Sequence, residues 1–353
     1  MSKFLSEKYA ALTPYTPGEQ PQNRKYVKLN TNESPFPPSE KAVKAAQEQA
    51  EILQLYSDPE CKVLVRAIAE HFSVGEENVI CTNGSDEILD FAFKCFCDDD
   101  TPAAFPEISY GFYPVYAQAN RVPYTEIPLK ADFSIDAEDY CGINKTIIIA
   151  NPNAPTGIAL PLSDIEKIVA TNPDNVVLID EAYVDFGAES AVSLTKKYKN
   201  LLVAQTFSKS RSLAGGRLGF GIASAEIISD LNTLRFSTNP YNINRMTMFA
   251  GAAAILDDEY MLKNSRVIQE NREYTTEKLN EMGFSVLPSK ANFIFAETDK
   301  IDGGRLYLEL KERGVLVRHF TKPSISNFNR ITIGTREQMD ILLDTIKIIL
   351  GEK

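Results

Sequence analysis

Short runs of mostly β-branched residues alternate with amphipathic stretches through this chain, and this alternation constrains the fold more than any other feature. Strands are expected at 79–82, 146–150, 176–179, 201–206 and 219–223. Helices are expected at 41–55, 62–72, 88–97 and 163–170. Strands that alternate with helices form βαβ units, so the pattern predicts an α/β fold with a mostly parallel, buried sheet flanked by helices.

The pattern of expected helices and strands changes after Asn239 and Pro240. Long helices are expected at 245–256, 260–282 and 336–350, and strands at 293–296, 315–318 and 329–333. Strands beside helices in such a segment indicate a smaller α+β domain. We therefore expect an N-terminal arm over 1–30, a large α/β domain over 31–240 and a small α+β domain over 241–353.

Composition argues against several classes of protein. The chain has 353 residues with 37 Lys and Arg against 48 Asp and Glu, and it has no dense basic run, which argues against a nucleic-acid partner. The start lacks the apolar core of a secretory signal and no run of 18 apolar residues occurs, which predicts a cytoplasmic protein without a membrane partner. Five cysteines without a CxxC pair, and two histidines, argue against disulfides and against a metal site.

A lysine on a turn of small residues, directly after an expected strand, is the most informative site feature. Hydroxyl groups precede Lys209 at Thr206 and Ser208, and Arg217 follows eight residues later. A lysine amine can form an imine with an aldehyde cofactor. Hydroxyl and guanidinium donors suit a phosphate on that cofactor. Taken alone, this stretch leaves open the alternative of a polar turn with an exposed lysine.

Three motifs in order give this lysine a context. Residues 206–215 resemble the signature of class II aminotransferases, residues 150–157 resemble a loop of fold-type I pyridoxal 5′-phosphate (PLP) enzymes, and residues 176–183 resemble the strand that delivers an aspartate to the pyridine nitrogen. The resemblance implies a fold-type I transferase with PLP on Lys209. It implies that Asp180 keeps the ring nitrogen protonated, and that Asn153 and Tyr183 donate hydrogen bonds to the phenolic oxygen. Taken in isolation, each residue has a structural alternative. Asp180 would cap the next helix, Asn153 would belong to an ordinary Pro-rich turn, and Tyr183 would be a core tyrosine.

The same resemblance assigns further residues to the cofactor. Gly84, Ser85 and Asp86 begin a helix after a strand, where backbone N–H groups can bind the PLP phosphate, although Ser and Asp are also ordinary helix caps. Tyr110 matches the aromatic residue that stacks on the cofactor ring. Tyr56 matches a tyrosine that reaches the phosphate in the neighbouring subunit, which implies a homodimer with a shared active site.

Over nearly the whole chain the sequence resembles the histidinol-phosphate aminotransferases. That family passes an amino group between L-histidinol phosphate with 2-oxoglutarate and imidazole-acetol phosphate with L-glutamate, a step of histidine biosynthesis. The resemblance implies that Arg330, helped by Arg318, binds the anionic end of the substrate. Tyr15, Asn32 and Glu33, near the N-terminal arm, are further candidates for substrate binding, and plain structural contacts are their alternative.

Other functions remain open at this point. An aromatic-amino-acid aminotransferase or a threonine-phosphate decarboxylase would share the fold and the cofactor. A nicotinamide-dependent oxidoreductase would need a GxGxxG fingerprint at a strand-to-helix turn, and the sequence has none. A non-catalytic PLP-binding regulatory domain would need an attached DNA-binding module, for which the enzyme-like chain leaves little room.

Overall fold

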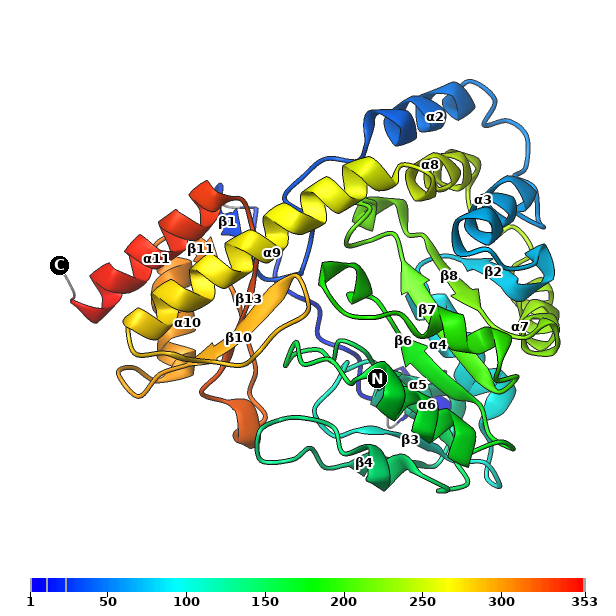
Figure 1. The fold of residues 1–353 in the computed structure, drawn as a ribbon, viewed down its shortest axis with the longest axis horizontal. Helices are drawn as coiled ribbons and strands as arrows, with labels where there is room; N and C mark the ends of the chain where they lie inside the picture. Colours follow the sequence, from blue (N-terminus) through cyan, green and yellow to red (C-terminus); the bar gives the residue numbers. More distant parts are fainter. Residues whose placement is uncertain (1, 11, 23, 352–353) are drawn as a thin grey trace.

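A seven-stranded sheet forms the centre of the larger part of the molecule (Figure 1). The computed structural model describes residues 2–10, 12–22 and 24–351. The sheet has the order β2-β8-β7-β6-β5-β3-β4. Its strands are β2 (Val79–Thr82), β3 (Ala103–Pro106), β4 (Tyr124–Ile127), β5 (Thr146–Ala150), β6 (Val177–Asp180), β7 (Leu201–Thr206) and β8 (Gly219–Ile222). Strand pairs from β7 to β4 are parallel, whereas β8 is antiparallel to β7 and to β2. The predicted α/β fold is confirmed.

Both faces of the inner strands are buried, which explains why these strands are mostly apolar, whereas the edge strand β4 is exposed at all but Ile127. Side chains alternate along a strand, so Ile147 and Ile149 of β5 belong to one core, and Ile148 and Ala150 belong to the other. One core is completed by α4 (Ser85–Phe96), α5 (Tyr113–Asn120) and α7 (Ala225–Thr238). The other is completed by α2 (Glu40–Ala50), α3 (Lys62–Phe72), α6 (Leu162–Thr171) and α8 (Arg245–Ile255).

A four-stranded antiparallel sheet organises the smaller part, with the order β12-β13-β10-β9. Its elements are β9 (Ser285–Val286), β10 (Phe293–Glu297), β12 (Arg318–His319), β13 (Asn329–Thr332), α9 (Asp258–Glu281), α10 (Gly303–Glu312) and α11 (Arg336–Leu350). Figure 1 shows α9 running from beside α8 to this smaller layer. Near the start of the chain, β1 (Val27–Lys28) pairs in parallel with β11 (Val315–Leu316), so the arm joins the smaller part.

Shorter elements connect these layers. The arm contains α1 (Glu7–Ala10), and 3-10 helices lie at Glu76–Asn78, Ala137–Tyr140, Val184–Phe186, Ala191–Lys196, Ala214–Gly216 and Pro323–Ile325. Within the described residues, no helix combines the length and the apolar character needed to cross a lipid bilayer.

Two expectations for single elements were wrong. The strand expected at 315–318 is divided, because β11 pairs with β1 whereas β12 pairs with β13 in another sheet. The helix expected over 41–55 ends at Ala50, where Glu51 forms its C-cap. The domain division stays a prediction, and packing favours a boundary after α8, because Met248 and Ile255 lie in a core of the large sheet.

Candidate active site

Parallel strands bring the predicted cofactor residues together at one edge of the large sheet. Asp180 is the last residue of β6, and Lys209 follows the end of β7 on a turn. Gly84 follows β2, which runs in the same direction as β7 because both are antiparallel to β8. Tyr110 follows β3. The carboxyl ends of parallel strands are the usual ligand-binding edge of an open α/β sheet.

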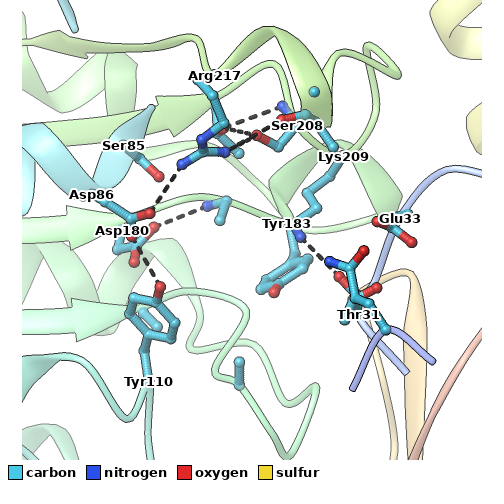
Figure 2. Close-up of a pocket in the computed structure, with 17 residues that line it drawn as sticks. Thr31, Glu33, Ser85, Asp86, Tyr110, Asp180, Tyr183, Ser208, Lys209 and Arg217 are labelled. Atoms are coloured by element: carbon cyan, nitrogen blue, oxygen red, sulfur yellow. Dashed lines mark hydrogen bonds and ion pairs between the residues drawn. The ribbon is translucent and has the colours of Figure 1, made fainter. Parts of the chain in front are cut away.

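A cavity of about 440 Å³ opens at this edge (Figure 2). Its lining includes ten of the residues predicted from the sequence: Glu33, Ser85, Asp86, Tyr110, Asp180, Tyr183, Thr206, Ser208, Lys209 and Arg217. Side chains that are far apart in the sequence therefore share one concave site, the arrangement expected for a small-molecule cofactor.

Lys209 projects its amine into the middle of the cavity (Figure 2). Its Nζ donates a long hydrogen bond of 3.3 Å to the carbonyl oxygen of Thr31, and it lies 5.7 Å from the centre of the Tyr183 ring. Burial, reinforced by the positive charge of Arg330, lowers the pKa of Lys209 to about 8. An amine with this pKa is partly neutral close to physiological pH, which a nucleophilic lysine requires.

Asp180 faces the same cavity from the end of β6. Its carboxylate accepts hydrogen bonds from the Tyr113 hydroxyl at 3.0 Å and from the backbone N–H of Ala182 at 3.2 Å. Burial raises the pKa of Asp180 to about 6, while these two hydrogen bonds oppose the rise. The side chain can therefore be an anion at neutral pH and can pair with a protonated ring nitrogen.

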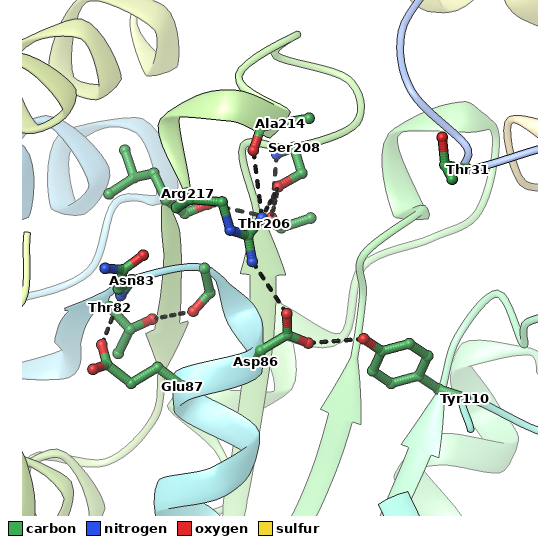
Figure 3. A network of polar contacts seen from close by, with 12 residues as sticks. Thr31, Thr82, Asn83, Asp86, Glu87, Tyr110, Thr206, Ser208, Ala214 and Arg217 are labelled. Atoms are coloured by element: carbon green, nitrogen blue, oxygen red, sulfur yellow. Dashed lines mark hydrogen bonds and ion pairs between the residues drawn. The ribbon is translucent and has the colours of Figure 1, made fainter. Parts of the chain in front are cut away.

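Polar groups at the other end of the cavity form a connected network (Figure 3). Arg217 donates to Asp86 at 3.1 Å, and Asp86 accepts from the Tyr110 hydroxyl at 2.9 Å. Oγ of Ser208 lies 3.0 Å from Oγ1 of Thr206. The guanidinium and hydroxyl donors are the groups that a phosphate would bind.

Gly84 allows this end of the cavity to close tightly. Its φ of 79° lies in the left-handed region, and a Cβ there would come within 2.6 Å of Nη2 of Arg217. Ser85 begins α4 directly after it, so the helix N-terminus faces the same space.

Two predicted site residues lie beside the cavity instead of lining it. Asn153 donates to the carbonyl oxygen of Ile108 at 2.9 Å and accepts from Ser109 at 2.7 Å, so its amide is engaged with the protein. Asn32 donates to the hydroxyl oxygen of Tyr183 at 3.0 Å. This bond fixes the Tyr183 hydroxyl next to the amine-bearing cavity.

The predicted substrate residues Tyr15, Arg318 and Arg330 line a second cavity of about 420 Å³. The two cavities share Tyr110 and Ala154 in their linings, so they are neighbours. Arg330 donates to the carbonyl oxygen of Asn30 at 3.1 Å, and its Nε has no hydrogen-bond partner among the described residues. Burial lowers the pKa of Arg330. A buried guanidinium with an unused donor suits an anionic ligand.

Arg318 differs from Arg330, because protein groups already occupy its guanidinium. It donates to the carbonyl oxygens of Thr16 at 2.8 Å and Pro17 at 3.1 Å. These contacts hold the N-terminal arm over the second cavity, where the ring of Tyr15 lies 4.7 Å from that of Phe112.

Tyr56 lies outside both cavities of this chain. Its side chain is 80% exposed and stacks on Tyr241 with ring centres 4.7 Å apart. An exposed aromatic pair is available for contact with another molecule.

Sequence reasoning missed three groups of the site. Tyr113 holds Asp180, Thr31 accepts from Lys209, and Gln20 lines the first cavity. Tyr113 follows Tyr110 by three residues, a spacing that places both on the same side of a helical turn. This spacing could have drawn attention to Tyr113, but it does not reveal that the partner of its hydroxyl is Asp180, 67 residues away. A backbone acceptor such as Thr31 leaves no signal in the sequence.

The large mixed sheet, the smaller α+β layer and the lysine opposite a buried aspartate define a fold-type I transferase. Residues 24–346 match the family described as aminotransferase class I and II, and the chain belongs to that family. Histidinol-phosphate aminotransferases of Brachyspira hyodysenteriae and Acinetobacter baumannii are 49% and 50% identical to it, covering 99% and 98% of this chain and 99% and 97% of theirs. The crystal structure of histidinol-phosphate aminotransferase from Sinorhizobium meliloti with pyridoxal-5′-phosphate has the same fold, with a TM-score of 0.90, 21% identity, and 99% and 98% coverage.

The residues of the first cavity fit PLP. Lys209 has an amine with a long hydrogen bond, Asp180 is a buried carboxylate, and a Cβ at Gly84 would displace the guanidinium of Arg217 from its present position. Ser208 and Arg217 add phosphate donors at the opposite end from Glu33 (Figure 2). A lysine, a carboxylate and a phosphate cradle are the three groups that this cofactor needs.

Proposed function

We propose that this chain catalyses the PLP-dependent transfer of an amino group between L-histidinol phosphate with 2-oxoglutarate and imidazole-acetol phosphate with L-glutamate, a step of histidine biosynthesis. The proposal is carried by one observation. Lys209 and Asp180 face a single cavity in a chain that is about half identical, over nearly its full length, to histidinol-phosphate aminotransferases.

Lys209 and Asp180 have different roles in the proposed reaction. When bound, PLP supplies an aldehyde for an amine and a ring that withdraws electrons from the substrate Cα. The Lys209 amine, with its pKa of about 8, would take the proton from Cα of the substrate and deliver it to the adjacent carbon of the cofactor, C4′. Asp180, as an anion, holds a proton at the ring nitrogen. The hydroxyl of Tyr183, oriented by Asn32, would donate toward the phenolic oxygen. The amide of Asn153, in contrast, already donates to Ile108 and Thr156.

The neighbouring cavity supplies substrate binding. Arg330 offers its guanidinium to the phosphate of histidinol phosphate in one half-reaction and to a carboxylate of glutamate in the other. Arg318 acts mainly by holding the arm, which places Tyr15 over the same cavity. Glu33 borders the first cavity, and its carboxylate is therefore a candidate for contact with the imidazole. Lys28 pairs with this carboxylate at 2.6 Å and holds it in place.

The proposal includes a cytoplasmic homodimer with a shared active site. The exposed Tyr56–Tyr241 pair supports a subunit contact, because adjoining exposed aromatic side chains mark a binding surface more often than single scattered ones do. In such a dimer Tyr56 reaches the cofactor phosphate of the partner subunit. Sedimentation of the wild-type protein, compared with Tyr56→Asp, tests this contact.

An absorption spectrum of the purified protein with PLP tests the proposed function. We expect a visible band that is lost in Lys209→Ala and bleached by L-histidinol phosphate at much lower concentration than by L-phenylalanine. Bleaching mainly by phenylalanine would move the substrate to aromatic amino acids, and the absence of any band after addition of PLP would contradict the proposal.

A further inference from the structure

Tyr113, the first residue of α5, is the buried group of this region that the proposed chemistry leaves unused. Its ring packs 5.6 Å from Tyr110 and 5.7 Å from Phe105, and it does not border either cavity. Its hydroxyl donates to Oδ2 of Asp180 at 3.0 Å. It therefore contacts the site through the aspartate.

We propose that Tyr113 is a positioning residue that holds the Asp180 carboxylate ionised and in one orientation toward the ring nitrogen of the cofactor. The inference rests on the proposed function, because it assigns a task to a residue behind the cofactor.

The geometry around Asp180 carries this inference. Oδ2 accepts from Tyr113 and Oδ1 accepts from the N–H of Ala182, so two donors from different elements fix the rotation of the carboxylate. The other titratable groups facing it are Asp86 of α4, Tyr116 of α5, Lys209 on the turn after β7, and Tyr183. Asp86 opposes ionisation of Asp180 and Lys209 favours it. Without the phenol, one backbone N–H would be the remaining hydrogen-bond donor for a buried anion.

Packing alone does not account for a hydroxyl at this position, because phenylalanine would fill the same space. Tyr140 provides a comparison within the chain, since it is equally buried and its hydroxyl has no hydrogen-bond partner among the described residues. Tyr110, three residues before Tyr113, makes the corresponding bond to Asp86. The turn over 110–113 thus braces two of the three carboxylates that line the cavity, Asp86 and Asp180.

Binding of PLP to the cofactor-free protein, measured over a range of pH, tests the inference without any assay of turnover. Tyr113→Phe should weaken binding roughly tenfold, the usual effect of losing one hydrogen bond to a charged group. As the solution is made acidic, the variant should lose PLP binding at a higher pH than the wild type does, because the pKa of Asp180 rises when the phenol is lost. Tyr140→Phe, the matched control, should bind as the wild type does.

A double-mutant cycle separates positioning from packing. In an Asp180→Asn background, Tyr113→Phe should have no further effect on PLP affinity. The inference would be overturned if Tyr113→Phe lowered PLP affinity equally in both backgrounds, or if it left the acid midpoint of PLP binding unchanged. If Tyr113→Phe does not fold, 3-fluorotyrosine at position 113, which fills nearly the same space with a stronger O–H donor, should move the acid midpoint of PLP binding to lower pH, and an unchanged midpoint overturns the inference as well. Failure of the wild-type protein to bind PLP at all would instead contradict the proposed function.

Discussion

Replacing Lys209 with methionine should stabilise the cofactor-free protein while abolishing amino transfer. Burial lowers the pKa of Lys209 from 10.5 to about 8, so the folded protein binds the lysine proton less tightly than the unfolded chain does. Each pKa unit corresponds to about 1.4 kcal/mol, which makes the cost of the charged amine at most about 3 kcal/mol near pH 7. Methionine has a similar length and carries no charge, so the variant avoids this cost.

The difference in stability between Lys209→Met and the wild type should decrease as the pH rises. Between pH 8 and 10.5 the unfolded chain binds more protons at this position, so wild-type stability rises with pH. The advantage of Lys209→Met should therefore shrink by about 2 kcal/mol between about pH 7 and about pH 9.5. The assay is urea denaturation of both proteins without PLP, with Lys347→Met, a half-exposed lysine on α11, as control. A gain that does not change with pH, or a loss of stability near pH 7, would refute the reasoning.

Three further substitutions test other parts of the site and its support. Gly84→Ala should weaken PLP binding by at least about tenfold in a fluorescence titration, because its Cβ would lie 2.6 Å from Nη2 of Arg217 and the backbone would be strained. Arg330→Lys should raise KM for L-histidinol phosphate by about tenfold with little change in melting temperature, since the forked donor is lost. Arg211→Met should lower the free energy of unfolding by about 2 kcal/mol, because its buried guanidinium donates to the carbonyl oxygens of Ala254 and Ile255 as well as pairing with the half-exposed Asp258. The exposed pair of Arg313 should contribute less than about 1 kcal/mol when Arg313→Met is measured in the same way.

Much of the large sheet could be predicted from the sequence because its central strands are buried on both faces. β7 and β5 are nearly continuous apolar runs, and both were placed at the observed bounds. β3 could not be recognised in this way, since Ala103 and Ala104 are small and Pro106 ends the run. α5 begins with Tyr113 and Pro114 and has no clear apolar face, so its sequence gives no helical signal.

Site residues could be predicted where they sit in local motifs, and not where they depend on folding. Asp180 ends one apolar strand and Lys209 follows another, and the parallel sheet brings those strand ends together. The carbonyl oxygens of Thr16 and Pro17 that bind Arg318 come from the opposite end of the chain, about 300 residues away. A charged side chain expected at the substrate therefore proves to be engaged in holding the arm, which only the folded structure reveals.

Asn32 connects the smaller sheet to the cavity and gives the sharpest test of that connection. Its backbone N–H donates to Oγ1 of Thr332 in β13 at 3.0 Å, and its side-chain amide donates to the Tyr183 hydroxyl at the same distance. Its φ of 56° lies in the left-handed region, where alanine costs about 1 kcal/mol and glycine does not.

The variants Asn32→Ala and Asn32→Gly therefore separate the bond from the backbone strain. Both lose the donor to Tyr183, so kcat should fall about equally, whereas Asn32→Ala should be less stable than Asn32→Gly by about 1 kcal/mol in urea denaturation. Recovery of kcat in Asn32→Gly would mean that backbone geometry at this position, and not the hydrogen bond to Tyr183, links the smaller sheet to the cavity.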